Sequence, residues 1–187
     1  LRMSLEQQNR RALLAGLGMA ATSVTLGGRT AEAQGAVTPF TPARHEQDAW
    51  MSAMPGQHRV VLDVVSPVGV PDGIRFAGNL FTGNKTGYGV EEAELAPIVV
   101  LRHSATAYGY NDAIWSKHGK VIDGKATPPP VANPYNSGER MQLAGLAKRG
   151  VQFIICGTAS RGLAGRLAGQ GGDTDGVLKE MTANLIP

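Results

Sequence analysis

The single cysteine, Cys156, is the residue best placed to do chemistry in this chain. It follows an apolar run, residues 151–155, that lies between two glycines and is typical of a strand buried on both faces of a parallel sheet. Ligands bind beyond the carboxyl ends of such strands, so the thiol is expected at the rim of a site. A helix that begins two or three residues later would direct backbone N–H groups and a positive dipole end towards it, which stabilises a thiolate.

Polar residues also follow or interrupt two other apolar runs. Arg102 and His103 come directly after the run 97–101. Asp63 interrupts the run 60–65, where it either holds a loop N–H group or pairs with Arg102 across the sheet. We assign candidate catalytic roles to Cys156, His103 and Arg161, and candidate ligand-binding roles to Asp63, Arg102, Asn111 and Gly157.

Each of these residues also has a plainer interpretation. Cys156 is a reactive thiol, a buried small hydrophobe, or one half of a disulfide between subunits. His103 is an acid–base partner or ligand, or a hydrogen-bonded residue at a strand end. The histidines show no metal-binding spacing with one another or with Cys156, so no metal is predicted. The segment 83–87 lacks the spacing of a phosphate-binding loop, so no nucleotide or other cofactor is predicted.

From residue 59 onward, apolar runs alternate with segments of helical periodicity. This βαβαβα order predicts an α/β domain with a doubly wound parallel sheet, in which right-handed crossovers bring Cys156 and His103 to the same crevice. A proline-rich surface loop is expected over 120–136. The predicted strands are 60–65, 97–101 and 151–155, and the predicted helices are 73–88, 112–119, 137–149, 158–167 and 173–181.

Composition fits one domain and argues against nucleic acid as a partner. The chain has 187 residues, of which 42% are hydrophobic, and a net charge of +3. Four basic and two acidic residues lie within 1–33, which leaves 14 basic and 13 acidic residues in the remainder. A nearly neutral body with 5% aromatic residues has neither the charge nor the stacking surface of a nucleic-acid-binding domain.

The first 33 residues resemble a twin-arginine export signal. Arg10 and Arg11 precede an uncharged run, residues 12–28, which is followed by the cleavage pattern Ala31-Glu32-Ala33. We therefore expect export to the periplasm by the twin-arginine machinery and cleavage after Ala33. An uncleaved anchor and an amphipathic helix of a cytosolic protein are the alternatives.

Residues 34–58 are expected to form a linker and a short helix over 43–54. This helix carries Trp50, Met51 and Met54 on one side. Such a stripe indicates packing against the domain or a neighbouring subunit rather than a cofactor site.

Residues 59–187 resemble the DsrE-like family, which includes sulfur-relay proteins with a flavodoxin-like fold. The resemblance is to the exported, twin-arginine-tagged branch and is most specific in the cysteine block, where Gly-x-x-x-x-x-Cys-Gly ends at Gly157. It implies that Cys156 carries a persulfide, that Arg161 stabilises a thiolate or anion, and that His103 is a proton partner. The segments that carry the resemblance are 59–63, 79–88, 100–103, 111–115 and 148–162.

The resemblance also implies a homo-oligomer, a trimer or hexamer, and a sulfur donor or acceptor protein as partner. Relatives run on through at least one more strand, so we expect a C-terminal strand to be missing here and one sheet edge to be bare. Two functions follow from the sequence. The first is a periplasmic sulfur or thiol-redox carrier that uses Cys156. The second is a non-catalytic binding or assembly module in which Cys156 is inert.

Overall fold

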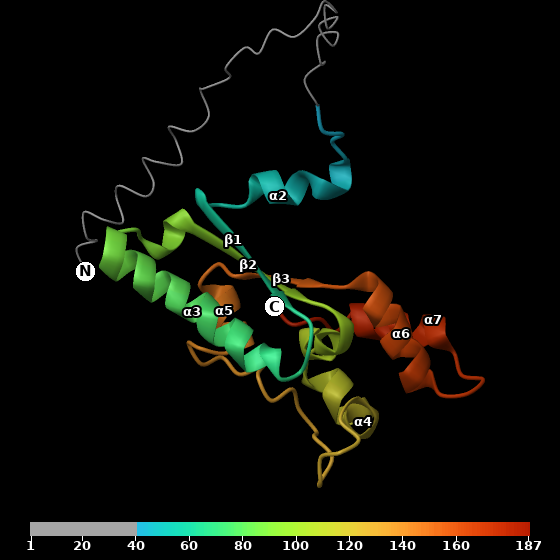
Figure 1. The fold of residues 1–187 in the computed structure, drawn as a ribbon. Coiled ribbons are helices and arrows are strands. Elements are labelled where there is room, and N and C mark those ends of the chain that lie inside the picture. The colour runs from blue at the N-terminus through green and yellow to red at the C-terminus, as the bar shows by residue number, and fades with distance from the viewer. Residues whose placement is uncertain (1–40) are drawn as a thin grey trace, which may run out of the picture. The chain divides into compact units, whose positions relative to one another are not determined.

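Residues 41–187 are described by a computed structural model, and their centre is a three-stranded parallel sheet (Figure 1). The strands are β1 (His58–Val64), β2 (Leu95–Leu101) and β3 (Gln152–Ile155), in the order β1-β2-β3. Val64 is the register partner of Leu101, which in turn is the partner of Ile155. The three carboxyl ends therefore lie side by side, as the prediction of a parallel α/β domain requires.

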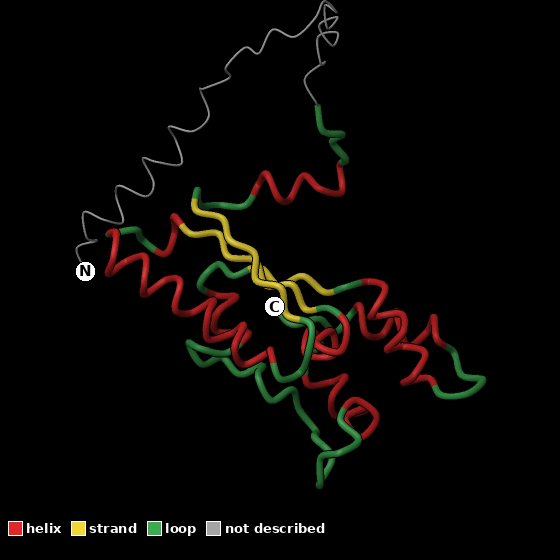
Figure 2. Tube along the Cα trace, in the orientation of Figure 1, coloured by secondary structure: helices red, strands yellow, loops and turns green. Residues whose placement is uncertain are grey.

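Helices follow each strand and also precede the first one (Figure 2). Among the described residues, a compact unit runs from His45 to Pro187. Its helical elements are η1 (Glu46–Asp48), α2 (Ala49–Ala53), α3 (Gly69–Tyr88), η2 (Glu92–Glu94), η3 (His103–Gly109), α4 (Asp112–Ile122), α5 (Leu143–Lys148), α6 (Gly157–Ala168) and α7 (Thr174–Thr182).

The larger part of the core lies between the sheet and the two crossover helices, α3 and α5 (Figure 1). Since the strands are in sequential order and crossovers are right-handed, both connections bring their crossover helices, α3 and α5, to the same face. The sequence places Ile74, Ala77, Leu80 and Phe81 at helical spacing on α3. Leu80 is half-buried and the other three are buried, so they form the inner stripe of the helix.

The opposite face of the sheet has a thinner cover. Met54, which follows α2, packs there against Ala96 and Ile98 of β2. Val61 of β1 lies on the same face, because it is the register partner of Ile98, and its side chain is 61% exposed. Trp50 and Met51 are both 40% exposed, so Met54 is the residue of the predicted apolar stripe that the domain buries.

The expectation that β3 is buried on both faces was wrong. Gln152 is exposed, and the three residues that follow it are half-buried. The reason is strand order, because β3 is bonded to β2 along one side and is an edge strand of the described sheet. β2, the central strand, has the near-continuous burial that was predicted for β3.

A second apolar cluster lies beyond the carboxyl ends of the strands. It joins η3, α4, α6 and α7 through buried Tyr110, Trp115, Leu163 and Met181. Asn133, in the predicted surface loop, is 5% exposed, and its Nδ2 donates to the carbonyl oxygens of Tyr108 and Tyr110 at 2.9 and 2.8 Å. The loop therefore holds the end of η3 in place.

Helix starts were predicted correctly where a short side chain caps the helix. Asn111 accepts a hydrogen bond from the N–H of Ala113, and Asp173 accepts one from the N–H of Gly176. The predicted start of α5 at Ser137 was wrong, since the helix begins at Leu143.

The predicted export signal, residues 1–33, lies outside the described residues, as does the linker up to residue 40. Among the described helices, none is long and apolar enough to cross a membrane.

Candidate functional site

Cys156 stands at the junction of β3 and α6, at the carboxyl edge of the sheet. Its N–H group donates to the carbonyl oxygen of Leu101 at 3.1 Å, which continues the β2–β3 ladder by one bond. Cys156 itself is the N-cap of the twelve-residue helix α6, and its side chain makes no capping hydrogen bond. The residue is half-buried. The helix therefore begins even closer to the thiol than the sequence predicted.

Asp63 and Arg102 form a bidentate ion pair at the same edge. Arg102 Nε donates to Oδ1 of Asp63 at 2.7 Å, and Nη2 donates to Oδ2 at 2.6 Å. Of the two alternatives for Asp63, pairing across the sheet is the one observed. The hydrogen bonds from Arg102 lower the pKa of the Asp63 carboxyl from its ordinary value.

The charge of Arg102 is also coupled to Cys156. Hydrogen bonding to Asp63 is the main cause that raises the pKa of Arg102, and a negative charge on Cys156 adds to it. This coupling reflects the sheet register, because Arg102 follows Leu101 and Cys156 follows Ile155, and the latter two are partners. Arg102 and Cys156 thus leave the sheet next to each other.

His103 extends the ion pair by one contact. Its Nε2 lies 2.8 Å from Nη1 of Arg102. A guanidinium can only donate, so Nε2 accepts, and a neutral ring then carries its proton on Nδ1. His103 has a φ of 51°, in the left-handed region that side chains other than glycine adopt at a cost. The exposed imidazole is therefore held at the edge by an unusual backbone conformation and by Arg102.

The three remaining sequence-predicted residues make the following contacts. Arg161 Nη2 pairs with Oδ1 of Asp175 at 3.0 Å, which holds the guanidinium towards α7. Asn111 caps α4, and its Nδ2 donates to Oδ1 of Asn184 at 3.3 Å. Gly157 is exposed and is the first residue of α6.

The structure therefore brings Asp63, Arg102, His103 and Cys156 together at one edge. The sheet register places Arg102 next to the thiol, and the role predicted for Arg161 stays a prediction.

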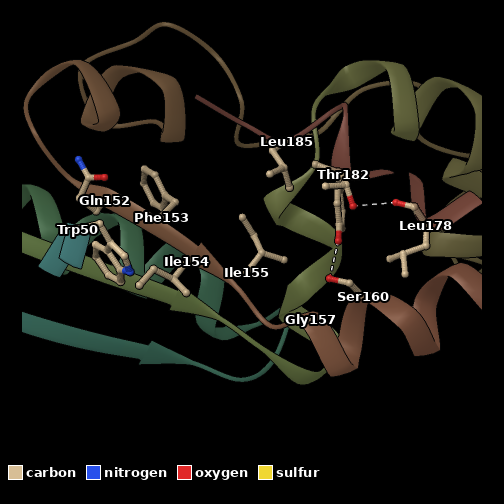
Figure 3. A pocket seen from close by; sticks show the side chains of 11 residues that line it. Trp50, Gln152, Phe153, Ile154, Ile155, Gly157, Ser160, Leu178, Thr182 and Leu185 are labelled. Carbon is tan, nitrogen blue, oxygen red and sulfur yellow. Dashed lines mark hydrogen bonds between the residues drawn. The ribbon is translucent and has the colours of Figure 1, made fainter. Parts of the chain in front are cut away.

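A cavity of about 630 Å³ runs along the outer edge of β3 and reaches the residues on both sides of Cys156, namely Ile155 and Gly157 (Figure 3). Its wall is mostly apolar and comes from α2, β3, α6, α7 and the chain end. The lining residues are Trp50, Tyr110, Gln152, Phe153, Ile154, Ile155, Gly157, Ser160, Leu178, Thr182 and Leu185.

Sequence reasoning missed two polar residues beside this cavity, Tyr110 and Ser160. Both are buried, and the Tyr110 hydroxyl lies 2.5 Å from Oγ of Ser160. A buried tyrosine beside an apolar helix looks like a packing residue in a sequence. The signal that was available is the serine four residues after the cysteine, a spacing that lets a hydroxyl reach back to the carbonyl at the start of a helix.

The described residues contain no group of three or more His, Cys, Asp or Glu side chains that could hold a metal ion. Comparisons of the chain with known protein families, with curated proteins and with solved structures find no match. The resemblance to the DsrE-like family thus rests on the sequence motifs, and function has to be argued from the site.

Proposed function

We propose that this protein is a DsrE-like sulfur carrier that holds sulfane sulfur on Cys156 within a flavodoxin-like fold. The observation that supports the proposal is the placement of a half-buried thiol at the N-cap of α6 beside the Asp63–Arg102–His103 network. Thiols that exchange sulfur occupy positions of this kind, where positive charge and helix N–H groups lie near a partly exposed sulfur.

The transfer is an exchange between a thiolate and a persulfide. The thiolate of Cys156 attacks the outer sulfur of a donor persulfide R–S–SH, a new S–S bond forms, and the bond from R–S to that sulfur breaks. The products are Cys156–S–SH and R–S⁻, so atoms and charge balance without an oxidant. Delivery is the same reaction in reverse, with an acceptor thiolate attacking the outer sulfur and Cys156 leaving as thiolate.

The neighbouring residues have distinct roles in this exchange. Arg102 supplies positive charge for the thiolate, and Asp63 fixes the guanidinium through two hydrogen bonds. His103, whose Nε2 already accepts from Arg102, offers an Nδ1–H hydrogen bond to the leaving thiolate. Export by the twin-arginine machinery, with cleavage after Ala33, belongs to the same proposal and rests on the Arg10-Arg11 motif.

The test is to treat the chain with a low-molecular-weight persulfide and follow its mass. We expect the protein to gain one sulfur atom and to lose it again on addition of an acceptor thiol. The Cys156→Ala variant is the control, and since the chain has a single cysteine it should gain nothing. A wild-type protein that stays unmodified although its thiol is alkylated would contradict the proposal.

A second candidate is a non-catalytic homo-oligomeric module, which we expect to be a trimer or hexamer. It is favoured by the apolar surface of β1, where Val61 is 61% exposed, and by the two open edges of the described sheet. Sedimentation of the wild type and of Cys156→Ala separates the two functions. Assembly that survives the loss of the thiol, without any gain of sulfur by the wild type, would favour the module.

A further inference from the structure

Two buried hydroxyl groups, those of Tyr110 and Ser160, form a hydrogen-bonded chain that ends on the backbone of Cys156. Tyr110 is 2% exposed and Ser160 is 5% exposed. The Tyr110 hydroxyl lies 2.5 Å from Oγ of Ser160, which lies 2.8 Å from the carbonyl oxygen of Cys156. A carbonyl oxygen can only accept, so Ser160 donates to Cys156 and accepts from Tyr110. The direction of the whole chain is thereby determined.

The carbonyl group of Cys156 receives a second hydrogen bond as well. The N–H of Ser160 donates to it at 2.9 Å, the first backbone bond of α6. Two donors on one oxygen fix the peptide plane that joins Cys156 to Gly157. That plane also carries the N–H of Gly157, one of the free donors that give a helix N-terminus its attraction for negative charge. The hydroxyl chain therefore controls the backbone that surrounds the thiol.

Helix formation alone does not require the tyrosine hydroxyl. The ring of Tyr110 packs in an apolar cluster with Trp115 and Leu163, and this burial raises the pKa of Tyr110. A phenol in such surroundings needs a hydrogen-bond partner, and here the partner is the serine that contacts Cys156. The hydrogen bond with Ser160 lowers the pKa of Tyr110, and a negative charge on Cys156 raises it by a smaller amount, so the hydroxyl and the thiol lie within electrostatic reach of each other.

We propose that Tyr110 and Ser160 act as a pair of positioning residues that hold Cys156 in its reactive orientation. The biological meaning of the pair rests on the proposed sulfur transfer. The effect of the pair on the reactivity of the thiol does not depend on sulfur transfer and can be measured without it. In the absence of the pair, α6 still forms, but the peptide plane after Cys156 is held by one hydrogen bond in place of two.

The test is a double-mutant cycle read by alkylation. The single cysteine makes the labelling rate with neutral iodoacetamide specific for Cys156, and the rate is measured from neutral to alkaline pH. The variants are Tyr110→Phe, which removes one oxygen and keeps the ring, Ser160→Ala, and the two combined. The control is Thr86→Val on α3, because the Thr86 hydroxyl also donates to a carbonyl four residues earlier, at 2.9 Å, but far along the chain from the thiol.

We expect each single variant to slow alkylation about threefold per folded molecule and to move the pH profile of the rate, with the double variant no slower than Ser160→Ala alone. Thr86→Val should match the wild type. Unchanged profiles in both single variants, or independent effects that add in the double variant, would overturn the inference. The persulfide experiment tests the carrier function separately, since a thiol that accepts no sulfur can still respond to these substitutions in its alkylation.

Discussion

Two arginine–carboxylate pairs of the same geometry occupy very different surroundings in this protein. Arg102 binds both carboxylate oxygens of Asp63 at the carboxyl edge of the sheet, where their side chains are 40% and 48% exposed. Arg149 binds both oxygens of Glu92 at 3.0 and 2.8 Å, but its side chain is 10% exposed and lies over the ring of Phe81 at 4.2 Å. Burial thus separates a pair that can serve a reaction from one that stabilises the fold.

The two guanidinium groups differ in their contacts and in how much of their surface remains exposed to solvent. Arg149 is enclosed by an aromatic ring and by a carboxylate that Arg140 also contacts at 2.8 Å. Arg102 keeps an open side towards solvent, contacts His103, and lies next to Cys156 at the strand ends. Ion pairs exposed to water contribute little to stability, so we expect substitution of Arg102 to change the stability of the protein only slightly. Substitutions in the two pairs should therefore affect different measurements.

The largest expected effect is on stability, at Arg149. Replacing it in Arg149→Gln removes two charge-assisted hydrogen bonds and the contact with Phe81, and we expect the free energy of unfolding to fall by about 2 kcal/mol. Arg140→Gln is the matched control, because Arg140 contacts the same carboxylate with its side chain 69% exposed and should cost about 0.5 kcal/mol or less. Urea unfolding measures both. Equal losses of unfolding free energy in Arg149→Gln and Arg140→Gln would mean that burial does not determine what each arginine contributes to stability.

The next effect is on thiol chemistry, at Arg102. We expect Arg102→Gln to slow alkylation of Cys156 about threefold at neutral pH and low salt, because a positive charge near the thiolate is lost. The urea midpoint should hardly move. Arg75→Gln, which breaks an exposed pair with Asp72 on α3, is the control and should leave the rate unchanged.

The same assay decides between two arginines. If Arg161→Gln slows alkylation as much as Arg102→Gln, the prediction from sequence that Arg161 serves the thiol is supported after all. A rate that responds to Arg102 alone would agree with the contact of Arg161 to Asp175.

The smallest effect is on acid stability. Hydrogen bonds from Arg149 lower the pKa of Glu92 below its ordinary value of 4.5, so the folded state binds this proton less readily than the unfolded state. The contribution of Glu92 is therefore complete above that value and is lost as the pH falls below it. We expect urea unfolding of Glu92→Gln to depend less on pH below about 4.5 than that of the wild type. Parallel curves for the two proteins would contradict this assignment.

Features that depend on neighbours in sequence could be predicted well. The three strands were found from short apolar runs, and the N-caps Asn111 and Asp173 from short polar side chains ahead of helical periodicity. The pairing of Asp63 with Arg102 was also among the alternatives, because a charge in an apolar strand needs a partner.

Features that depend on strand order could not be predicted. Burial of β3 was overestimated, since periodicity does not tell a central strand from an edge strand. Arg161 was predicted to serve the thiol because it is close in sequence, and this stays a prediction. The position of Arg102 beside Cys156 arises from the pairing of β2 with β3, which the sequence does not show. Asn133 lies in a loop without periodicity, and its contacts with η3 and Tyr110 appear only in the fold.

The N-cap position of Cys156 has a thermodynamic consequence. Serine, threonine, asparagine and aspartate are favoured there because their oxygen accepts a helix N–H, and the Cys156 side chain makes no such bond. We expect a serine at this position to stabilise the folded protein by on the order of 1 kcal/mol relative to an alanine, and so to give the higher melting temperature. Cysteine at the start of α6 is therefore expected to make the helix less stable than serine would. Thermal unfolding of Cys156→Ser beside the wild type measures this difference, with Cys156→Ala as the reference without a cap.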